Sequence, residues 1–377
     1  MAPRWKVLVW LAFAAALLPS CGPSSTRGDL PPNSGYAQYA RYFDRVDGGV
    51  VSISPYDGSA DTLWLAGESP SRIVCMSTSH VGFLDAIGAD SLIVAVSGCG
   101  FVSSPRVRAR IDSGDVREAG YDSAPALETL VELKPDLVLC YAVGAGEEAF
   151  SERLRALGLR TFTLYEHLEA HPLARAEYLR LFGILTGRED AANSLFAEIV
   201  GRYEALAGDS FAALGMTDAA SDCHPEEATP TKGSVAGRQK VLLNLPYAGQ
   251  WYIPGAESYL SRLIRDAGGE VLGAEAGETR SSVISLEKAY QLSLEADFWL
   301  NAGSVRSLDE LLGLNAAFSA FPVARPGRVF TNDRLSTPAG GNDFWESGAV
   351  RPDLILQDLR RIFSGRTDSL YYYQPVL

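Results

Sequence analysis

The sequence is poor in the residues that metal sites, disulfide frameworks and nucleic-acid surfaces require. Its 377 residues include five cysteines and four histidines, and no cysteine spacing resembles a zinc motif. Acidic residues (46) outnumber basic ones (33), and the formal net charge is −13. Clustered phosphate contacts are therefore not expected, which argues against a nucleic-acid partner. A free-metal site would need three or four converging ligands, and four histidines do not favour one.

The cysteines that follow Cys21 do not suggest a disulfide-stabilised fold. Cys75 and Cys140 fall in predicted buried strands, where cysteine usually acts as a small hydrophobic residue. We therefore expect no essential disulfide.

Sequence motifs of several enzyme classes are also missing. There is no G-x-S-x-G elbow or P-loop, and "GCGFVS" lacks the last glycine of the dinucleotide fingerprint. "HLEAH", residues 167–171, has its Glu at the third rather than the second position, and Pro172 should displace His171 from helical geometry. The sequence therefore predicts neither a zinc site there, nor a cofactor, nor a catalytic centre.

The N-terminal apolar run is too short to cross a membrane. Val7–Leu18 has twelve apolar residues after Arg4 and Lys6, whereas a membrane helix needs about 20. This pattern is typical of a cleaved export signal, which we predict for residues 1–20. "LPSC", ending at Cys21, resembles the lipobox of bacterial lipoproteins, in which the cysteine carries the lipid. The alternative is an ordinary signal peptide with an incidental cysteine.

The composition after the signal predicts a tether followed by a folded protein. Residues 21–35 are rich in Gly, Pro and Ser, which is typical of a flexible linker. We therefore expect an exported protein on the periplasmic or cell-surface face, held to the membrane only through a lipid on Cys21. With 47% hydrophobic and 21% charged residues, the remaining length favours two lobes.

Short β-rich runs alternate with helical stretches from Arg72 onward, and a second series of this kind begins at Lys240. The predicted fold class is α/β, with two lobes that are each a mainly parallel sheet flanked by helices, a long connecting helix, and a ligand cleft between the lobes. The predicted boundaries are 36–170 for an N-terminal lobe with an edge hairpin, 171–207 for connecting helices broken near Gly187, 208–238 for a mobile insertion, 239–365 for a C-terminal lobe and 366–377 for a tail.

One sequence pattern occurs once in each lobe. "PALETLVELKPDLVLCY" (125–141) and "SLEKAYQLSLEADFWLN" (285–301) both read as a helix that leads into an apolar strand. Glu128 and Glu287 fall at the start of the two helices, where the helix dipole favours a carboxylate by ~0.3–1 kcal/mol. This effect alone can account for both residues.

The segment "RIVCMSTSH…LDAIGA" followed by "PALETLVELKPDLVL" resembles the substrate-binding proteins of ABC importers for iron chelates, haem and cobalamin. The resemblance extends from about Arg72 to Phe363, and "GGNDFWESGAVRPDLILQDLRRIF" is similar to lipid-anchored members. It implies that Glu128 and Glu287 each dock into a basic pocket of a permease dimer. It also implies that the lobes close only modestly around the ligand.

In open α/β sheets, ligands bind beyond the carboxyl ends of the strands, so the candidate ligand residues are those in the loops after the strands. The candidates are His80, Phe101, Tyr141, Tyr165, Glu166, Trp251, Tyr252, Arg334, Asn342 and Asp343. Each type of candidate also has a structural alternative: a histidine at a helix start often serves as a cap, and a tyrosine after a strand often belongs to the rim or core. Asn342 or Asp343 can likewise cap a helix.

The expected function is capture of a small-molecule metal chelate, a ferric siderophore, haem or cobalamin, and its delivery to an ABC permease without catalysis. One alternative is an exported enzyme that modifies a chelate by means of Ser79 and His80. Another is a surface adhesion or scaffold protein without a small-molecule cleft.

Overall fold

The computed structural model describes residues 35–65, 67–121, 124–144, 149–213 and 237–377. The predicted signal peptide, Cys21, nearly all of the predicted tether and most of the predicted insertion lie outside these residues. Within the described ranges, none of the helices combines the length and the apolar character that spanning a bilayer requires.

The N-terminal lobe is built on a parallel five-stranded sheet with the strand order β10-β9-β4-β5-β6. Four of its strands are largely apolar because both faces of the sheet are covered, as is usual for parallel sheets, whereas the edge strand β6 is charged and exposed. Their bounds are Ile73–Cys75 (β4), Ile93–Val96 (β5), Arg117–Glu118 (β6), Leu137–Tyr141 (β9) and Thr161–Leu164 (β10). The helices of this lobe are Thr78–Ala86 (α1), Pro105–Asp112 (α2), Leu127–Leu133 (α3) and Ala149–Ala156 (α4), with short 3-10 turns at Asp90–Leu92 (η1), Cys99–Phe101 (η2) and Glu166–Leu168 (η3).

The predicted edge hairpin is confirmed and belongs to a three-stranded antiparallel sheet. Strand β2 (Gly49–Ile53) pairs on one side with β1 (Phe43–Val46) and on the other with β3 (Ala60–Trp64). A small two-stranded sheet, β7 (Gly120–Tyr121) with β8 (Ala124–Pro125), was not predicted.

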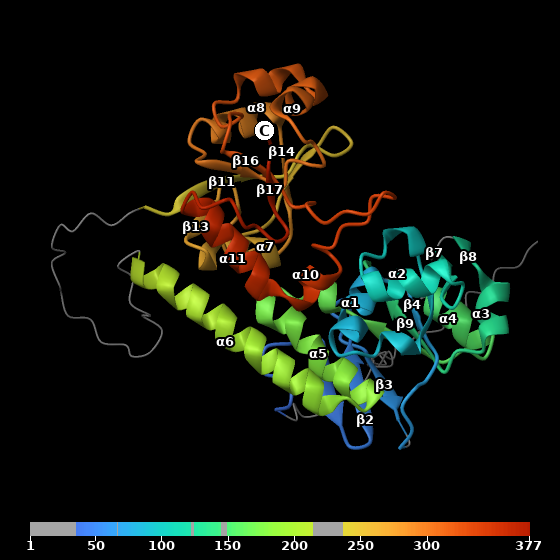
Figure 1. The fold of residues 1–377 in the computed structure, drawn as a ribbon. Helices are drawn as coiled ribbons and strands as arrows, with labels where there is room; N and C mark the ends of the chain where they lie inside the picture. The colour runs from blue at the N-terminus through green and yellow to red at the C-terminus, as the bar shows by residue number, and fades with distance from the viewer. Residues whose placement is uncertain (1–34, 66, 122–123, 145–148, 214–236) are drawn as a thin grey trace, which may run out of the picture.

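Two helices of very different exposure connect the lobes. Helix α5 (Pro172–Thr186) is almost entirely buried, whereas α6 (Glu189–Ala213) runs along the molecule from the N-terminal lobe to the C-terminal lobe (Figure 1). The predicted break is confirmed, because Gly187 ends α5 in the left-handed conformation that glycine adopts without a Cβ penalty. Residues 208–213 belong to α6, so the predicted insertion begins too early; its remaining residues are mostly outside the described chain.

The C-terminal lobe contains a second five-stranded sheet with the order β13-β11-β15-β16-β17, parallel except for β17. Strand β17 comes from the tail, which is therefore part of the lobe rather than a separate segment. The strands of this sheet are Gln239–Leu243 (β11), Gly269–Val271 (β13), Phe298–Leu300 (β15), Val329–Thr331 (β16) and Gln374–Pro375 (β17). Two further strands of the lobe, Trp251–Ile253 (β12) and Ser282–Ile284 (β14), lie outside it. The helices are Tyr259–Asp266 (α7), Leu286–Ser293 (α8), Leu308–Leu314 (α9), Ala316–Ala320 (3-10, η4), Ser347–Val350 (α10) and Pro352–Phe363 (α11).

Candidate functional site

The C-terminal lobe reaches across to the N-terminal lobe through residues 337–348, which include the sequence "GGNDFWESG". The Thr337 hydroxyl donates a hydrogen bond to the carbonyl of Gly100 (2.9 Å), and the two Glu346 carboxylate oxygens accept from the backbone N–H groups of Ser103 and Ser104 (2.7 Å each). A Cβ at Gly341 would overlap the backbone of Phe101. Because Gly341 has no side chain, the backbone of this loop can approach the backbone of the other lobe closely.

A cavity of about 570 Å³ lies between the lobes beside this contact. Its walls include Asp85 and Ser103 from the N-terminal lobe and Asp343, Tyr371 and Tyr372 from the C-terminal lobe. The volume is within the range of small-molecule sites in proteins. Residues of both lobes therefore enclose a space large enough for a small ligand.

Arg334 is exposed next to this cavity. Its Nη1 atom donates to the Tyr371 carbonyl (3.0 Å), and its backbone N–H donates to the Tyr372 carbonyl (3.1 Å). These bonds hold the backbone and one guanidinium nitrogen in place, while the residue as a whole remains exposed. Arginine in this position is suited to carboxylate or phosphate groups of a ligand.

Asn342 and Asp343 support the turn before α10, which agrees with the capping alternative. Asn342 Oδ1 accepts from the Phe344 N–H (3.0 Å). The Asp343 carboxylate accepts from the Ser347 hydroxyl (2.7 Å) and N–H (3.3 Å). Asp343 nevertheless lines the cavity, so its position remains compatible with ligand contact.

The predicted aromatic residues separate into an exposed and a buried group. Phe101 and Tyr252 are 38% and 36% exposed, and Tyr141 is half-buried. Tyr165 and Trp251 are buried, with Trp251 stacked on Trp299 in the core and its Nε1–H bonded to the Leu243 carbonyl (2.8 Å). Packing inside the C-terminal lobe covers Trp251, whereas Tyr165 contributes to a small polar pocket of about 190 Å³ beside the edge hairpin rather than to the cavity between the lobes.

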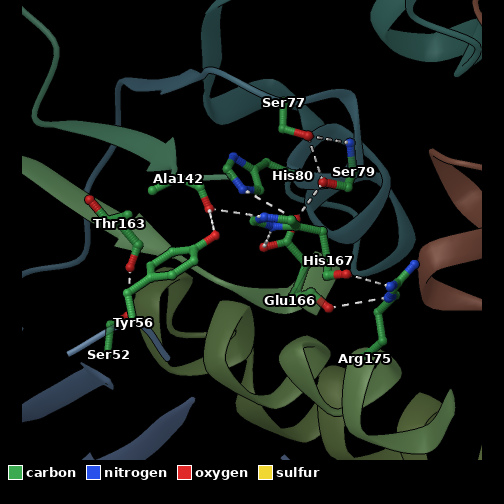
Figure 2. A network of polar contacts seen from close by, with 10 residues as sticks. All are labelled: Ser52, Tyr56, Ser77, Ser79, His80, Ala142, Thr163, Glu166, His167 and Arg175. Atoms are coloured by element: carbon green, nitrogen blue, oxygen red, sulfur yellow. Dashed lines mark hydrogen bonds and ion pairs between the residues drawn. The ribbon is translucent and has the colours of Figure 1, made fainter. Parts of the chain in front are cut away.

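A buried polar network connects the loop after β4 with the loop after β10 (Figure 2). The Ser79 hydroxyl donates to Glu166 Oε1 (2.6 Å), and His80 Nε2 lies 3.6 Å from the same oxygen. Burial alone would raise the pKa of Glu166, but the adjacent imidazoles of His80 and His167 hold it well below its usual value. His80 and Glu166 are both fully buried, so neither predicted residue faces a ligand here.

This network does not form a serine nucleophile with a histidine base. Ser79 bonds to Glu166 and Ser77, while neither ring nitrogen of His80 has a hydrogen-bond partner among the described residues. Activation of a serine needs a base within hydrogen-bond reach of the hydroxyl. Ser79 and His80 therefore do not form the nucleophile–base pair that the hydrolase alternative assumes.

Tyr56 and His167, which were not among the predicted ligand residues, lie together at the ends of β9 and β10 (Figure 2). The Tyr56 hydroxyl and His167 Nε2 both contact the Ala142 carbonyl (3.3 and 3.1 Å), and the His167 ring meets Tyr141 edge-on. Tyr56 comes from the edge hairpin turn, so only the folded chain brings it to the end of the parallel sheet. His167 follows strand β10 and could have been found by the rule that selected Tyr165 and Glu166.

His171 has a structural role, as its predicted displacement from the helix suggested. Its backbone is extended, and its Nδ1 accepts the Leu173 N–H (3.1 Å) at the start of α5. Pro172 occupies the first helical turn, where a missing N–H costs nothing. The "HLEAH" segment is therefore a turn followed by a helix cap.

Glu128 and Glu287 occupy equivalent positions in their helices. Each is exposed and is the second residue of its helix, in α3 and α8 respectively. Figure 1 shows α3 at the outer end of the N-terminal lobe and α8 at the outer end of the C-terminal lobe. Each lobe thus presents one carboxylate to solvent far from the connecting helices.

The described chain thus consists of two α/β lobes that are joined by helices and have a cavity between them. Residues 73–212 match the model of a family described as periplasmic binding protein. The matched residues extend from β4 to α6, so this part of the chain is similar to periplasmic binding proteins.

Two curated relatives align with most of this chain. An uncharacterized lipoprotein of Methanocaldococcus jannaschii is 23% identical over 309 residues, covering 78% of this chain and 66% of that protein. A cobalamin-binding protein of Halobacterium salinarum is 25% identical over 306 residues, covering 81% and 71%. The chain thus spans about two thirds of the length of these relatives.

Solved structures confirm the two-lobed fold. A periplasmic heme binding protein from Pseudomonas aeruginosa has a TM-score of 0.57 at 19% identity, with 82% of this chain and 95% of that chain covered. An ABC-type Fe3+-hydroxamate transport system protein from Saccharomonospora viridis has a TM-score of 0.53 at 17% identity, with 82% and 96% covered.

Proposed function

We propose that this protein captures a metal chelate, such as a ferric siderophore, haem or cobalamin, between its lobes and delivers it to an ABC permease. The observation that carries the proposal is the cavity formed by both lobes, beside which the exposed Arg334 is held by Tyr371. Each chelate class combines a bulky body with polar or anionic groups, and a cavity with tyrosine walls and an arginine at its edge suits that combination. The similar proteins include a cobalamin-binding protein, a periplasmic heme binding protein and a protein of an ABC-type Fe3+-hydroxamate transport system, and their descriptions support the same ligand class.

In this proposal Glu128 and Glu287 guide docking onto a permease dimer. Two exposed carboxylates, one per lobe, can steer the encounter with two basic pockets and set the orientation of the complex. The protein would be exported and held near the permease by a lipid on Cys21. The relative from Methanocaldococcus jannaschii, described as a lipoprotein, supports this localisation.

The proposal is tested by ligand titration followed by a transport assay. Purified protein is titrated with cyanocobalamin, haemin and a ferric hydroxamate, and we expect reversible 1:1 binding of one of them with the ligand recovered unchanged. The double variant E128Q/E287Q is then compared with wild type in uptake by the permease whose transport requires this protein. We expect at least about tenfold slower uptake with unchanged ligand affinity, because exposed carboxylates contribute little to the stability of the monomer.

The exposed Glu270 on β13 provides a control for each single variant, E128Q or E287Q, since E270Q also removes one carboxylate charge but lies outside α3 and α8. Conversion of the ligand during the titration would contradict the capture proposal. Equal uptake by wild type and the double variant would contradict docking through the two glutamates.

A further inference from the structure

A shallow apolar groove of about 270 Å³ lies beside Glu287 on the surface of the C-terminal lobe. It lies between α8 and the short helix η4, and Phe321, the residue after η4, also contributes to it. Its lining residues are Leu286, Glu287, Tyr290, Ala317, Ala320 and Phe321.

The floor of this groove is rigid because it continues into the aromatic core. Phe321 is 3% exposed and stacks on Trp251 and Trp299, with ring centroids 6.1 and 5.6 Å apart. The Tyr290 ring forms one side, 5.8 Å from the ring of Phe321. A groove with such a floor is already formed in the free protein. Binding of a partner therefore loses little conformational entropy in the protein.

Small side chains create the hollow, and a charge stands at its edge. Ala317 and Ala320 leave space that larger residues would fill. Glu287 is fully exposed and forms no ion pair with the described residues. Hydrogen bonds from its own backbone N–H and from the Ser285 hydroxyl lower its pKa, so the carboxylate is ionised at neutral pH.

This combination specifies the chemistry of the occupant. An unpaired carboxylate attracts a cation, and the adjoining apolar walls favour a large hydrophobic side chain close to that cation. Interface residues of this kind, with an apolar anchor in a pocket and charges at the rim, usually carry much of the binding energy.

The N-terminal lobe repeats part of this arrangement. On α3, Val131 follows Glu128 by three residues and is 45% exposed, as Tyr290 follows Glu287 by three residues and is 39% exposed. Residues three apart share one face of a helix. Each carboxylate therefore has an exposed apolar neighbour on the same helix face.

We propose that this groove is a docking socket for a permease loop that carries an aromatic or large aliphatic side chain next to a cationic one. The apolar side chain occupies the groove while the cation pairs with Glu287. This inference rests on the proposed docking role of Glu287 and adds a hydrophobic anchor to it.

The test is substitution of Ala320, which is exposed and lines the groove, by glutamate. A320E fills the hollow and places a second negative charge against the incoming apolar side chain. The control is S319E, which adds the same charge at the neighbouring exposed residue outside the groove lining. Affinity for the same permease, reconstituted in nanodiscs, is measured together with affinity for the ligand found in the titration.

We expect A320E to weaken permease binding at least about tenfold and S319E to change it less than about threefold, with ligand affinity unchanged in both. A second variant, Y290A, removes one wall of the groove without adding charge and should weaken binding in the same direction.

Normal permease binding by A320E and Y290A, with E287Q still impaired, would overturn the socket and leave glutamate docking intact. Normal binding by all three variants would remove both the socket and docking through Glu287. Loss of self-association in A320E with unchanged permease binding would assign the groove to a second copy of this chain, which also overturns the proposal.

Discussion

Glu346 connects the two lobes at the scale of a single residue. It is 1% exposed, and its carboxylate accepts the N–H groups of Ser103 and Ser104 at the start of α2. Burial raises the pKa of Glu346 to about 8 from its ordinary value of 4.5; the two N–H donors oppose this shift, and Asp343 and Asp85 add to it. We therefore expect the contact between the lobes through this side chain to depend on pH.

Replacing Glu346 by glutamine tests this dependence. The folded protein binds more protons than the unfolded chain between pH 4.5 and about 8, so the stability contributed by Glu346 is greatest at low pH and falls as the pH rises. The difference in unfolding free energy between wild type and E346Q should therefore shrink as the pH is raised from 5 to 8. Denaturant titrations at several pH values measure it, and a constant difference would contradict the assigned pKa.

At the scale of secondary-structure elements, the segment 337–348 fits between the lobes because its glycines have no Cβ. Gly341 lies against the Phe101 backbone, and Gly82 of α1 lies against the Glu346 carbonyl. Both contacts are between backbones, so neither can be relieved by a change of side-chain rotamer.

We expect Gly341→Ala to destabilise the protein by about 1–3 kcal/mol, because the new methyl group forces the segment away from Phe101. Thermal and denaturant unfolding measure the effect. The control is G313A in α9, where a Cβ meets nothing within 4 Å, and there we expect a gain of about 0.5–1 kcal/mol from the helix propensity of alanine. Equal effects of the two substitutions would show that the contact between the lobes is loose.

Most of these elements could be predicted from the sequence, while the contacts between them could not. Periodicity placed α3, α5, β10 and β15, and Gly187 marked the break between the connecting helices. Short strands such as β12, β14 and β17 have too few residues to show a period, and helix α2 was also missed. Their positions depend on pairing with segments far away in the chain.

At the scale of the whole molecule, three connections hold the lobes together. Helix α5 is buried in the core that both lobes share, α6 packs along α11, and α10 packs on α1 of the other lobe. Arg175 of α5 also lies over the ring of Tyr259 in α7, 3.8 Å from its centroid. A molecule connected in this way resists large rotation of one lobe against the other.

Small-angle X-ray scattering tests this rigidity in solution. We expect the radius of gyration of the free and ligand-bound protein to differ by less than about 1 Å, as for pre-organised binding proteins. A decrease of several ångströms on ligand binding would show that the lobes close as a hinge.

The sequence by itself determined the two α/β lobes, the connecting helices and the equivalent positions of Glu128 and Glu287, because apolar periodicity and helix-start signals depend on neighbouring residues. Only the tertiary structure decided that His80, Glu166 and Trp251 are buried, that Glu346 bonds to the opposite lobe, and that a groove adjoins Glu287. Exposure of a side chain depends on which distant segments pack over it, and local sequence patterns carry no information about that packing.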